Sequence, residues 1–238
     1  MKKILFILLF ALPLSVQGEI YAVLIGISEY EIPIGDLSYS HQDAIDMYEL
    51  LKEHTAPNKL KLLINKQATR DSIVYYTTQL FRQAQPEDIV LFFFSGHGQG
   101  NNFFAHDRFL YFSELKEIFK QTQAKRRLIF ADACYSGTLR PGDDPAPQNE
   151  KMNVMIFLSS RSSQYSIETR AYRNGAYTYF LLAGLRGGAD FNKDGYITAK
   201  ELYNFVYPKV RERTNGRQIP VMWGNFNKNM IILKQKNK

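Results

Sequence analysis

Six apolar runs of strand length recur along the chain. They cover Ile20 to Ile27, Leu60 to Ile64, Ile89 to Phe94, Leu128 to Ala131, Val154 to Leu158, and Met230 to Leu233. The runs are continuous rather than alternating, which is typical of strands that are covered on both faces.

Stretches with helical periodicity lie between several of these runs. Apolar side chains share one helix face in three of them: Ala44, Met47, Leu50 and Leu51, then Ile73, Tyr76, Leu80 and Phe81, then Leu115, Ile118 and Phe119. Residues 177–185 and 202–210 read as two further helices. Strands that alternate with helices predict an α/β fold, a three-layer sandwich with a mostly parallel central sheet and helices on both faces. Sites in such sheets gather at the edge where the strands end.

The first 18 residues have the three parts of a secretory signal peptide. A charged start with Lys2 and Lys3 is followed by an apolar run from Ile4 to Leu14 and by small residues up to Gly18, after which we expect cleavage. The run is shorter than the roughly 20 residues of a membrane helix, so a retained anchor is the less favoured alternative. We therefore expect an exported protein, periplasmic or extracellular, with no stable membrane span after signal removal and one domain over residues 19–238.

Charge and cysteine usage narrow the function further. The formal net charge is +7, and removing Lys2 and Lys3 with the signal lowers it by two to +5. The basic residues are scattered, which indicates a solvated surface and no nucleic-acid partner. The single cysteine, Cys134, cannot form an internal disulfide, although export favours such bonds. Another explanation for this cysteine is needed.

Two apolar runs end in abrupt polar turns that carry glycine. His97 lies between Gly96 and Gly98 after one run, and Cys134 follows the other. Cysteine chemistry needs a base within reach and backbone N–H groups aimed at the developing oxyanion. His97 is the candidate base, and the N–H groups of Gly98 and Cys134 are candidate oxyanion donors. A buried inert thiol and a simple turn histidine are the alternatives, but both residues at strand ends favour catalysis.

The two turns also carry a family resemblance. Residues 94–98 (Phe-Ser-Gly-His-Gly) and 132–137 (Asp-Ala-Cys-Tyr-Ser-Gly) resemble the histidine and cysteine motifs of caspase-like peptidases, including metacaspases. Residues 21–27, the Asp43-Ala44 pair and residues 159–166 resemble further family segments. The resemblance implies a cysteine endopeptidase with a Cys134–His97 dyad and with protein or peptide substrates.

The resemblance also implies a substrate pocket. In metacaspases, an aspartate two residues before the nucleophile and another in the first helix form an acidic pocket for a basic side chain, and Asp132 and Asp43 match them. Paired carboxylates favour Arg or Lys. Ser159 and Ser160 belong to the segment expected to line the same pocket. Residues 40–42 depart from the metacaspase pattern, and residues 101–107 are shorter than the matching segment of relatives. A helix-terminal role for Asp43 and a backbone-bonding role for Asp132 are the alternatives.

Residues 190–201 match the twelve-residue EF-hand calcium loop. The expected oxygen ligands are Asp190, Asn192, Asp194, the carbonyl of Tyr196, and Glu201, while Gly195 permits the sharp bend. Helices are predicted on both sides of the loop. We expect a structural Ca²⁺ ion there, and an ion-free Asp/Asn/Gly turn is the alternative. Catalysis by the dyad requires no cofactor.

A polar, proline-rich segment from Thr138 to Lys151 follows the cysteine and reads as an exposed loop. Caspases, by resemblance, are cut in this region. Pro141 after Arg140 hinders cleavage there, so Lys151 is the expected self-cleavage site. A non-catalytic calcium-binding interaction module on a caspase scaffold is the alternative function. A transpeptidase or a peptidase without basic specificity also stays open.

Overall fold

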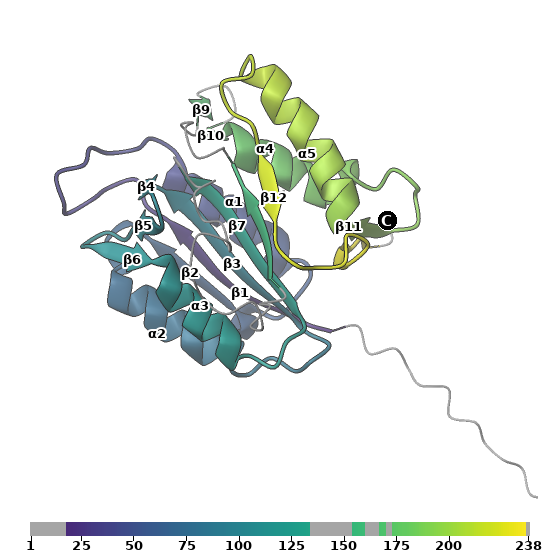
Figure 1. Cartoon of the computed structure of the whole chain (residues 1–238), viewed down its shortest axis with the longest axis horizontal. Coiled ribbons are helices and arrows are strands. Elements are labelled where there is room, and N and C mark those ends of the chain that lie inside the picture. The colour runs from purple at the N-terminus through teal and green to yellow at the C-terminus, as the bar shows by residue number, and fades with distance from the viewer. Residues whose placement is uncertain (1–17, 134–153, 160–166, 170–172, 237–238) are drawn as a thin grey trace, which may run out of the picture.

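A central six-stranded sheet forms the middle layer of the computed structural model, which describes residues 18–133, 154–159, 167–169 and 173–236 (Figure 1). Its strand order is β12-β8-β7-β3-β1-β2. The strands are β1 (Ile20–Gly26), β2 (Leu60–Ile64), β3 (Ile89–Gly96), β7 (Arg126–Ala133), β8 (Val154–Leu158) and β12 (Val221–Trp223). Neighbouring strands are parallel except β12, which is antiparallel to β8. The predicted mostly parallel α/β fold is confirmed.

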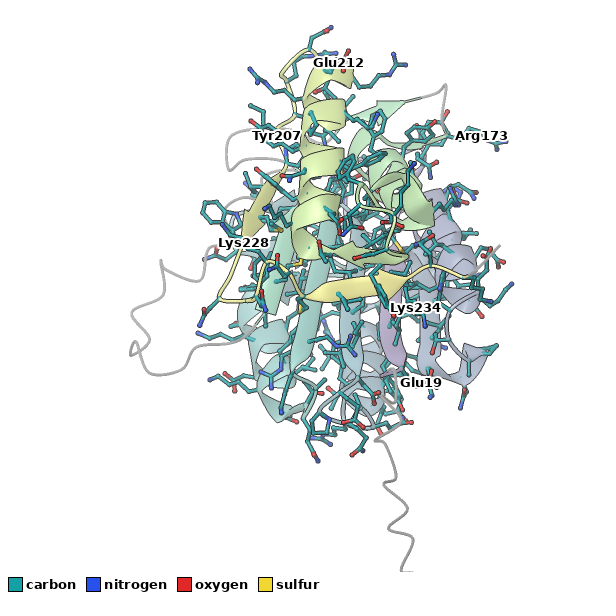
Figure 2. All side chains as sticks on the ribbon, turned by 90° about the vertical axis from the view of Figure 1, so that its right-hand side faces the viewer. Glu19, Arg173, Tyr207, Glu212, Lys228 and Lys234 are labelled. Carbon is teal, nitrogen blue, oxygen red and sulfur yellow. The ribbon has the colours of Figure 1, made fainter. Side chains whose placement is uncertain are left out.

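Helices cover both faces of this sheet. Helices α1 (Ser40–Lys52), α4 (Ala176–Ala183) and α5 (Ala199–Arg213) pack on one face, and α2 (Arg70–Phe81) and α3 (Phe112–Gln121) pack on the other. Figure 2 shows the first layer from the side, with Tyr207 and Glu212 along α5. Among the described residues, no helix is long and apolar enough to cross a membrane.

The two cores follow from the alternation of side chains along each strand. On β3, Leu91 and Phe93 join the core under α1, α4 and α5, while Phe92 and Phe94 join the core under α2 and α3. All eight residues of β3 are buried. Because both faces are covered, every position of this central strand has to be apolar or small, and this requirement produces the continuous run in the sequence.

Short elements complete the fold. Two 3₁₀ turns, η1 (Pro57–Lys59) and η2 (Asn65–Gln67), flank β2, and a π-helical turn, η4 (Gly184–Gly188), follows α4. Strands β9 (Glu168–Thr169) and β10 (Asn174–Gly175) pair with each other. Strands β4 (Gly98–Gln99), β5 (Asn102–Phe104) and β6 (Phe109–Tyr111) form a separate antiparallel sheet.

One predicted strand lies outside the central sheet. The apolar run at Met230 to Leu233 forms β13 (Ile231–Lys234), which pairs with β11 (Tyr196–Thr198) in a two-stranded antiparallel sheet. Figure 2 shows Lys234 of β13 near the start of α5. Ile231 and Lys234 at the two ends of the strand are exposed, whereas Ile232 and Leu233 between them are buried.

Candidate active site

The expected catalytic turns begin at neighbouring strand ends. Strands β3 and β7 are parallel and in register to their last residues, where Gly96 pairs with Ala133. His97 follows Gly96 and Cys134 follows Ala133 in the sequence. Cys134 lies outside the described residues, so its side chain has no described position. The register nevertheless starts the two turns side by side at the carboxyl edge of the sheet.

The imidazole of His97 is held by the loop that follows β1. Its Nε2 lies 3.0 Å from the carbonyl oxygen of Gly35, and its ring centroid lies 5.0 Å from that of Tyr30. The His97 backbone N–H also donates to the Tyr30 hydroxyl at 2.7 Å. Since a carbonyl only accepts, the bond to Gly35 requires a proton on Nε2. In neutral His97 the lone pair is therefore on Nδ1, which is the nitrogen able to act as a base.

Glycines beside His97 permit close backbone packing. A Cβ atom at Gly96 would lie 2.6 Å from the Tyr30 hydroxyl, so a larger residue would displace the side chain that holds the histidine. Gly98 is buried in β4 opposite Phe103, and the His97 carbonyl accepts from Phe104 N–H at 3.0 Å. The small antiparallel sheet therefore fixes the backbone on the C-terminal side of His97.

The expected pocket residues Asp43 and Asp132 come together around Gly175. A Cβ atom at Gly175 would lie 2.2 Å from Asp132 Oδ2 and 3.2 Å from Asp43 Oδ2. Asp43 is 1% exposed and Asp132 is 4% exposed. The two carboxylates therefore form a buried acidic cluster between α1, the end of β7 and the start of α4.

Neutral donors bind Asp43 and one oxygen of Asp132. Asp43 accepts from the Ser95 hydroxyl at 2.7 Å and from Asn174 Nδ2 and the Gly175 N–H, each at 3.0 Å. Asp132 Oδ2 accepts from the Thr178 hydroxyl at 2.9 Å and from its N–H at 3.2 Å.

The electrostatics of the pair follow from this burial. Burial, and then the charge of Asp132, raises the pKa of Asp43 well above its ordinary value. Burial and the same aspartate also raise the pKa of Tyr177. A cationic group entering here would relieve the repulsion between the two carboxylates.

Ser159 lies beside the residue that precedes Cys134, one position after Leu158, which pairs with Ala131. It is fully buried, and its hydroxyl donates to the Ala133 carbonyl and accepts from the Ala133 N–H, both at 3.2 Å. Ser159 therefore fixes the backbone of the residue that precedes Cys134. Ser160 and Lys151 lie outside the described residues.

The predicted calcium loop has the flanking elements that an EF-hand needs, with α4 and η4 before it and α5 after it. The Asp194 N–H donates to Asp190 Oδ1 at 3.2 Å and to Asn192 Oδ1 at 3.0 Å, which draws these side chains to the inside of the bend. Gly195 has φ +81°, as the sharp bend requires. The donor atoms are all oxygens, the type that Ca²⁺ prefers.

Glu201 forms the cap of α5 in this structure. Its Oε2 accepts from the N–H and the hydroxyl of Thr198, at 3.0 and 2.7 Å. In the part of the chain that the structure describes, no three His, Cys, Asp or Glu side chains gather as a metal site. The loop therefore has suitable ligand chemistry, and calcium binding stays a prediction.

Several site residues have no signal in the sequence. Tyr30 and Gly35 hold His97, while Asn174 and Thr178 hold the aspartates. Both pairs lie far along the chain from the His97 and Cys134 turns. Asp46 also joins the acidic cluster by accepting from Asn174 Nδ2 at 2.9 Å, and only its position one helical turn after Asp43 hints at this role.

Comparison with known proteins identifies the family. The model of the caspase domain (peptidase C14) matches residues 20–231, so the chain belongs to the caspase domain family. No curated protein matches the chain at a significant level.

Two solved structures share the fold. Caspase-1 from Spodoptera frugiperda superposes with a TM-score of 0.71 at 15% identity, covering 93% of this chain and 92% of that one. Protein GSU0716 from Geobacter sulfurreducens superposes with a TM-score of 0.68 at 19% identity, covering 92% and 97%.

Proposed function

We propose that this protein is a cysteine endopeptidase that cleaves after Arg or Lys. Membership of the caspase domain family supports a peptidase. The observation that carries the proposal is that the parallel strands β3 and β7 end at paired residues, Gly96 and Ala133. This register starts the His97 and Cys134 turns together, and the bond to Gly35 assigns the lone pair to His97 Nδ1. A base with a fixed tautomer beside a thiol is the arrangement that nucleophilic catalysis needs.

The proposed reaction has two steps. His97 Nδ1 takes the proton of the Cys134 thiol, and the thiolate attacks the scissile carbonyl carbon. The N–H groups of Gly98 and Cys134 stabilise the oxyanion. The C–N bond then breaks as His97 returns the proton to the leaving amine, which leaves a thioester. Water, deprotonated by His97, hydrolyses the thioester and regenerates the thiol.

Basic specificity is supported by the acidic cluster. The hydrogen-bond donors to Asp43 are neutral, so they lower the cost of its charge without cancelling it. An Arg or Lys side chain of the substrate would bring a positive charge next to Asp43 in a site shielded from water. The pKa of Asp43 would fall when the cation binds, since an opposite charge favours the ionised carboxylate.

Export and calcium belong to the same proposal. The signal-like start supports a periplasmic or extracellular location, although residues 1–17 lie outside the described residues. The loop at 190–201 would clamp η4 to α5 by binding Ca²⁺ through Asp190, Asn192, Asp194, Glu201 and the Tyr196 carbonyl. In Figure 1, β11 at the end of this loop lies on the right of the molecule and β4, which follows His97, lies on the left, and this separation supports a structural role.

Purified protein tests the proposal with Arg, Lys and Asp fluorogenic peptides, with and without Ca²⁺. We expect cleavage of the Arg and Lys peptides only. Cys134→Ala and His97→Ala should each abolish hydrolysis while circular dichroism shows a folded protein. Normal activity in either variant would contradict the dyad, and an inactive but calcium-binding wild type would favour the interaction module.

A further inference from the structure

Aromatic rings extend from His97 across the small antiparallel sheet. The His97 ring lies edge-on to Phe104 at 6.4 Å between centroids, Phe104 lies 4.7 Å from Phe109, and Phe109 lies 6.3 Å from Tyr111. Phe104 is on β5, and the other two are on β6. We call Phe104, Phe109 and Tyr111 the aromatic row. It connects the proposed catalytic base directly with the protein surface.

The outer members of the row are unusually exposed. Phe109 is 41% exposed and Tyr111 is 50% exposed, whereas Leu110 between them is fully buried in the core. The alternation fixes β6 with one face inward and one face outward. Single exposed aromatics need no explanation, but two side by side and continuous with a candidate catalytic residue are typical of a ligand-binding surface.

The acidic cluster and the aromatic row lie on opposite faces of the central sheet. The residues around the acidic cluster belong to the side of α1 and α4, where Tyr177 packs in one core. Phe103 and Leu110 of the small sheet pack in the other core, with α2 and α3. In Figure 1, β10 and α4 lie at the top of the molecule beside α5, whereas β5 and β6 lie at the left, next to α2 and α3. His97 stands at the sheet edge between the two.

The chemistry fixes the direction in which a substrate crosses this edge. His97 must hand a proton to the leaving amine, so the chain after the scissile bond has to lie on the histidine side of the nucleophile. The basic residue before the bond lies on the other side, in the acidic cluster. A peptide that satisfies both requirements runs from the α1 and α4 face to the aromatic row.

We propose that the aromatic row binds the substrate side chain that immediately follows the scissile bond and favours an aromatic or large aliphatic residue there. This inference rests on the proposed peptidase function. When an apolar side chain covers the exposed rings of Phe109 and Tyr111, water is removed from both surfaces, and this burial contributes favourable binding free energy. A small polar or acidic side chain at that position buries little apolar surface and contributes much less binding free energy.

Internally quenched peptides test the inference. Each has Arg before the scissile bond, and Phe, Leu, Ser or Asp after it. We expect wild type to show a kcat/KM about tenfold higher with Phe or Leu than with Ser, since removing a large apolar side chain from water contributes on this order. The double variant Phe109→Ala/Tyr111→Ala should reduce this ratio to within about twofold.

The controls distinguish a failure of the aromatic subsite from a failure of the peptidase proposal. Tyr75→Ala removes a 58% exposed aromatic from α2 and should keep the wild-type ratio. An acetylated peptide ending in Arg methyl ester, which has no side chain after the bond, reports wild-type peptidase chemistry independently. Ester hydrolysis with equal rates on all four peptides would overturn the aromatic subsite alone. No hydrolysis of any substrate would overturn the peptidase proposal and the subsite with it.

Discussion

Folding clearly raises the proton affinity of the Asp43 carboxyl. Its pKa is raised first by burial and then by the negative charge of Asp132. At pH values above the ordinary pKa of about 4, the folded protein still holds a proton that the unfolded chain has lost. The contribution of Asp43 to stability is therefore complete at low pH and declines as pH rises toward the folded pKa.

Asp43→Asn should flatten this decline. Asn keeps one oxygen for Asn174 and Gly175 but carries no charge, so the melting temperature of the variant should exceed that of wild type increasingly as pH rises from 4 to 8. Thermal unfolding of both proteins across this range measures the difference. Parallel curves would mean that the carboxyl of Asp43 titrates in the fold as it does in the unfolded chain.

Asp132 offers a test of substrate charge. Asp132→Asn retains an acceptor for Thr178, so it should fold normally while losing roughly 2 to 5 kcal/mol of transition-state stabilisation on Arg substrates, the cost of truncating a buried charge pair. Uncharged substrates should lose far less. The kcat/KM ratio between the two substrate classes measures the effect.

The alanine variant separates specificity from structure. Asp132→Ala should lose the same selectivity and in addition destabilise the fold by about 1 to 3 kcal/mol, because Thr178 loses its acceptor. Equal losses on both substrate classes in the Asn variant would place Asp132 outside the specificity pocket.

At the scale of elements, the calcium loop makes a distinct prediction. Ca²⁺ bound only to the folded state stabilises it by mass action, so EDTA should lower the melting temperature of wild type. Glu201→Gln is a matched variant because glutamine still accepts from Thr198 and preserves the cap of α5 while removing a charged ligand. The melting temperature of the variant should therefore be close to that of wild type in EDTA, and calcium should raise it less than it raises that of wild type.

Calorimetry checks the calcium prediction directly. We expect one ion bound per chain in wild type and weaker binding in Glu201→Gln. If no heat of binding is detected at millimolar Ca²⁺, the loop is an Asp/Asn/Gly bend stabilised by its own Asx hydrogen bonds.

The sequence predicts long elements better than short ones. Strand β3 is recognisable because burial on both faces demands an uninterrupted apolar run. Strands β4, β5 and β6 are two or three residues long, so no periodicity can emerge, and residues 101–107 read only as a shortened segment. The run at β13 has the composition of a central strand, and only tertiary pairing with β11 reveals its separate place.

Some residues of the site can likewise be predicted from the sequence, and others cannot. His97 is recognisable because a glycine-framed histidine after a buried strand is a local signal. Tyr30 and Gly35 orient it from a loop about 60 residues earlier, and a backbone carbonyl carries no side-chain identity that a sequence can reveal. The place of Ser159 in the substrate pocket stays a prediction, and no motif reveals that its hydroxyl also bonds both backbone groups of Ala133.

At the scale of the whole molecule, the fold bears on the predicted self-cleavage at Lys151. A cut there would separate β7 from β8, but these strands are adjacent and paired from Arg127↔Val154 to Ala131↔Leu158. Leu24 before the cut and Phe157 after it share one buried core. The two pieces should therefore remain associated.

Intact mass and size exclusion test this prediction. Wild type should yield fragments that correspond to a cut after Lys151 and elute together, while Cys134→Ala stays whole. Fully active wild type that remains a single chain would show that maturation by this cut does not occur.

The account depends most on Cys134 as a nucleophile activated by His97. Because the chain has a single cysteine, intact mass after incubation with an Arg-based peptidyl electrophile locates the reaction without ambiguity. We predict one adduct per chain in wild type, none in Cys134→Ala, and labelling slowed by about 100-fold or more in His97→Ala, as expected for loss of a general base. Equal labelling rates in wild type and His97→Ala, or an adduct on Cys134→Ala, would contradict it.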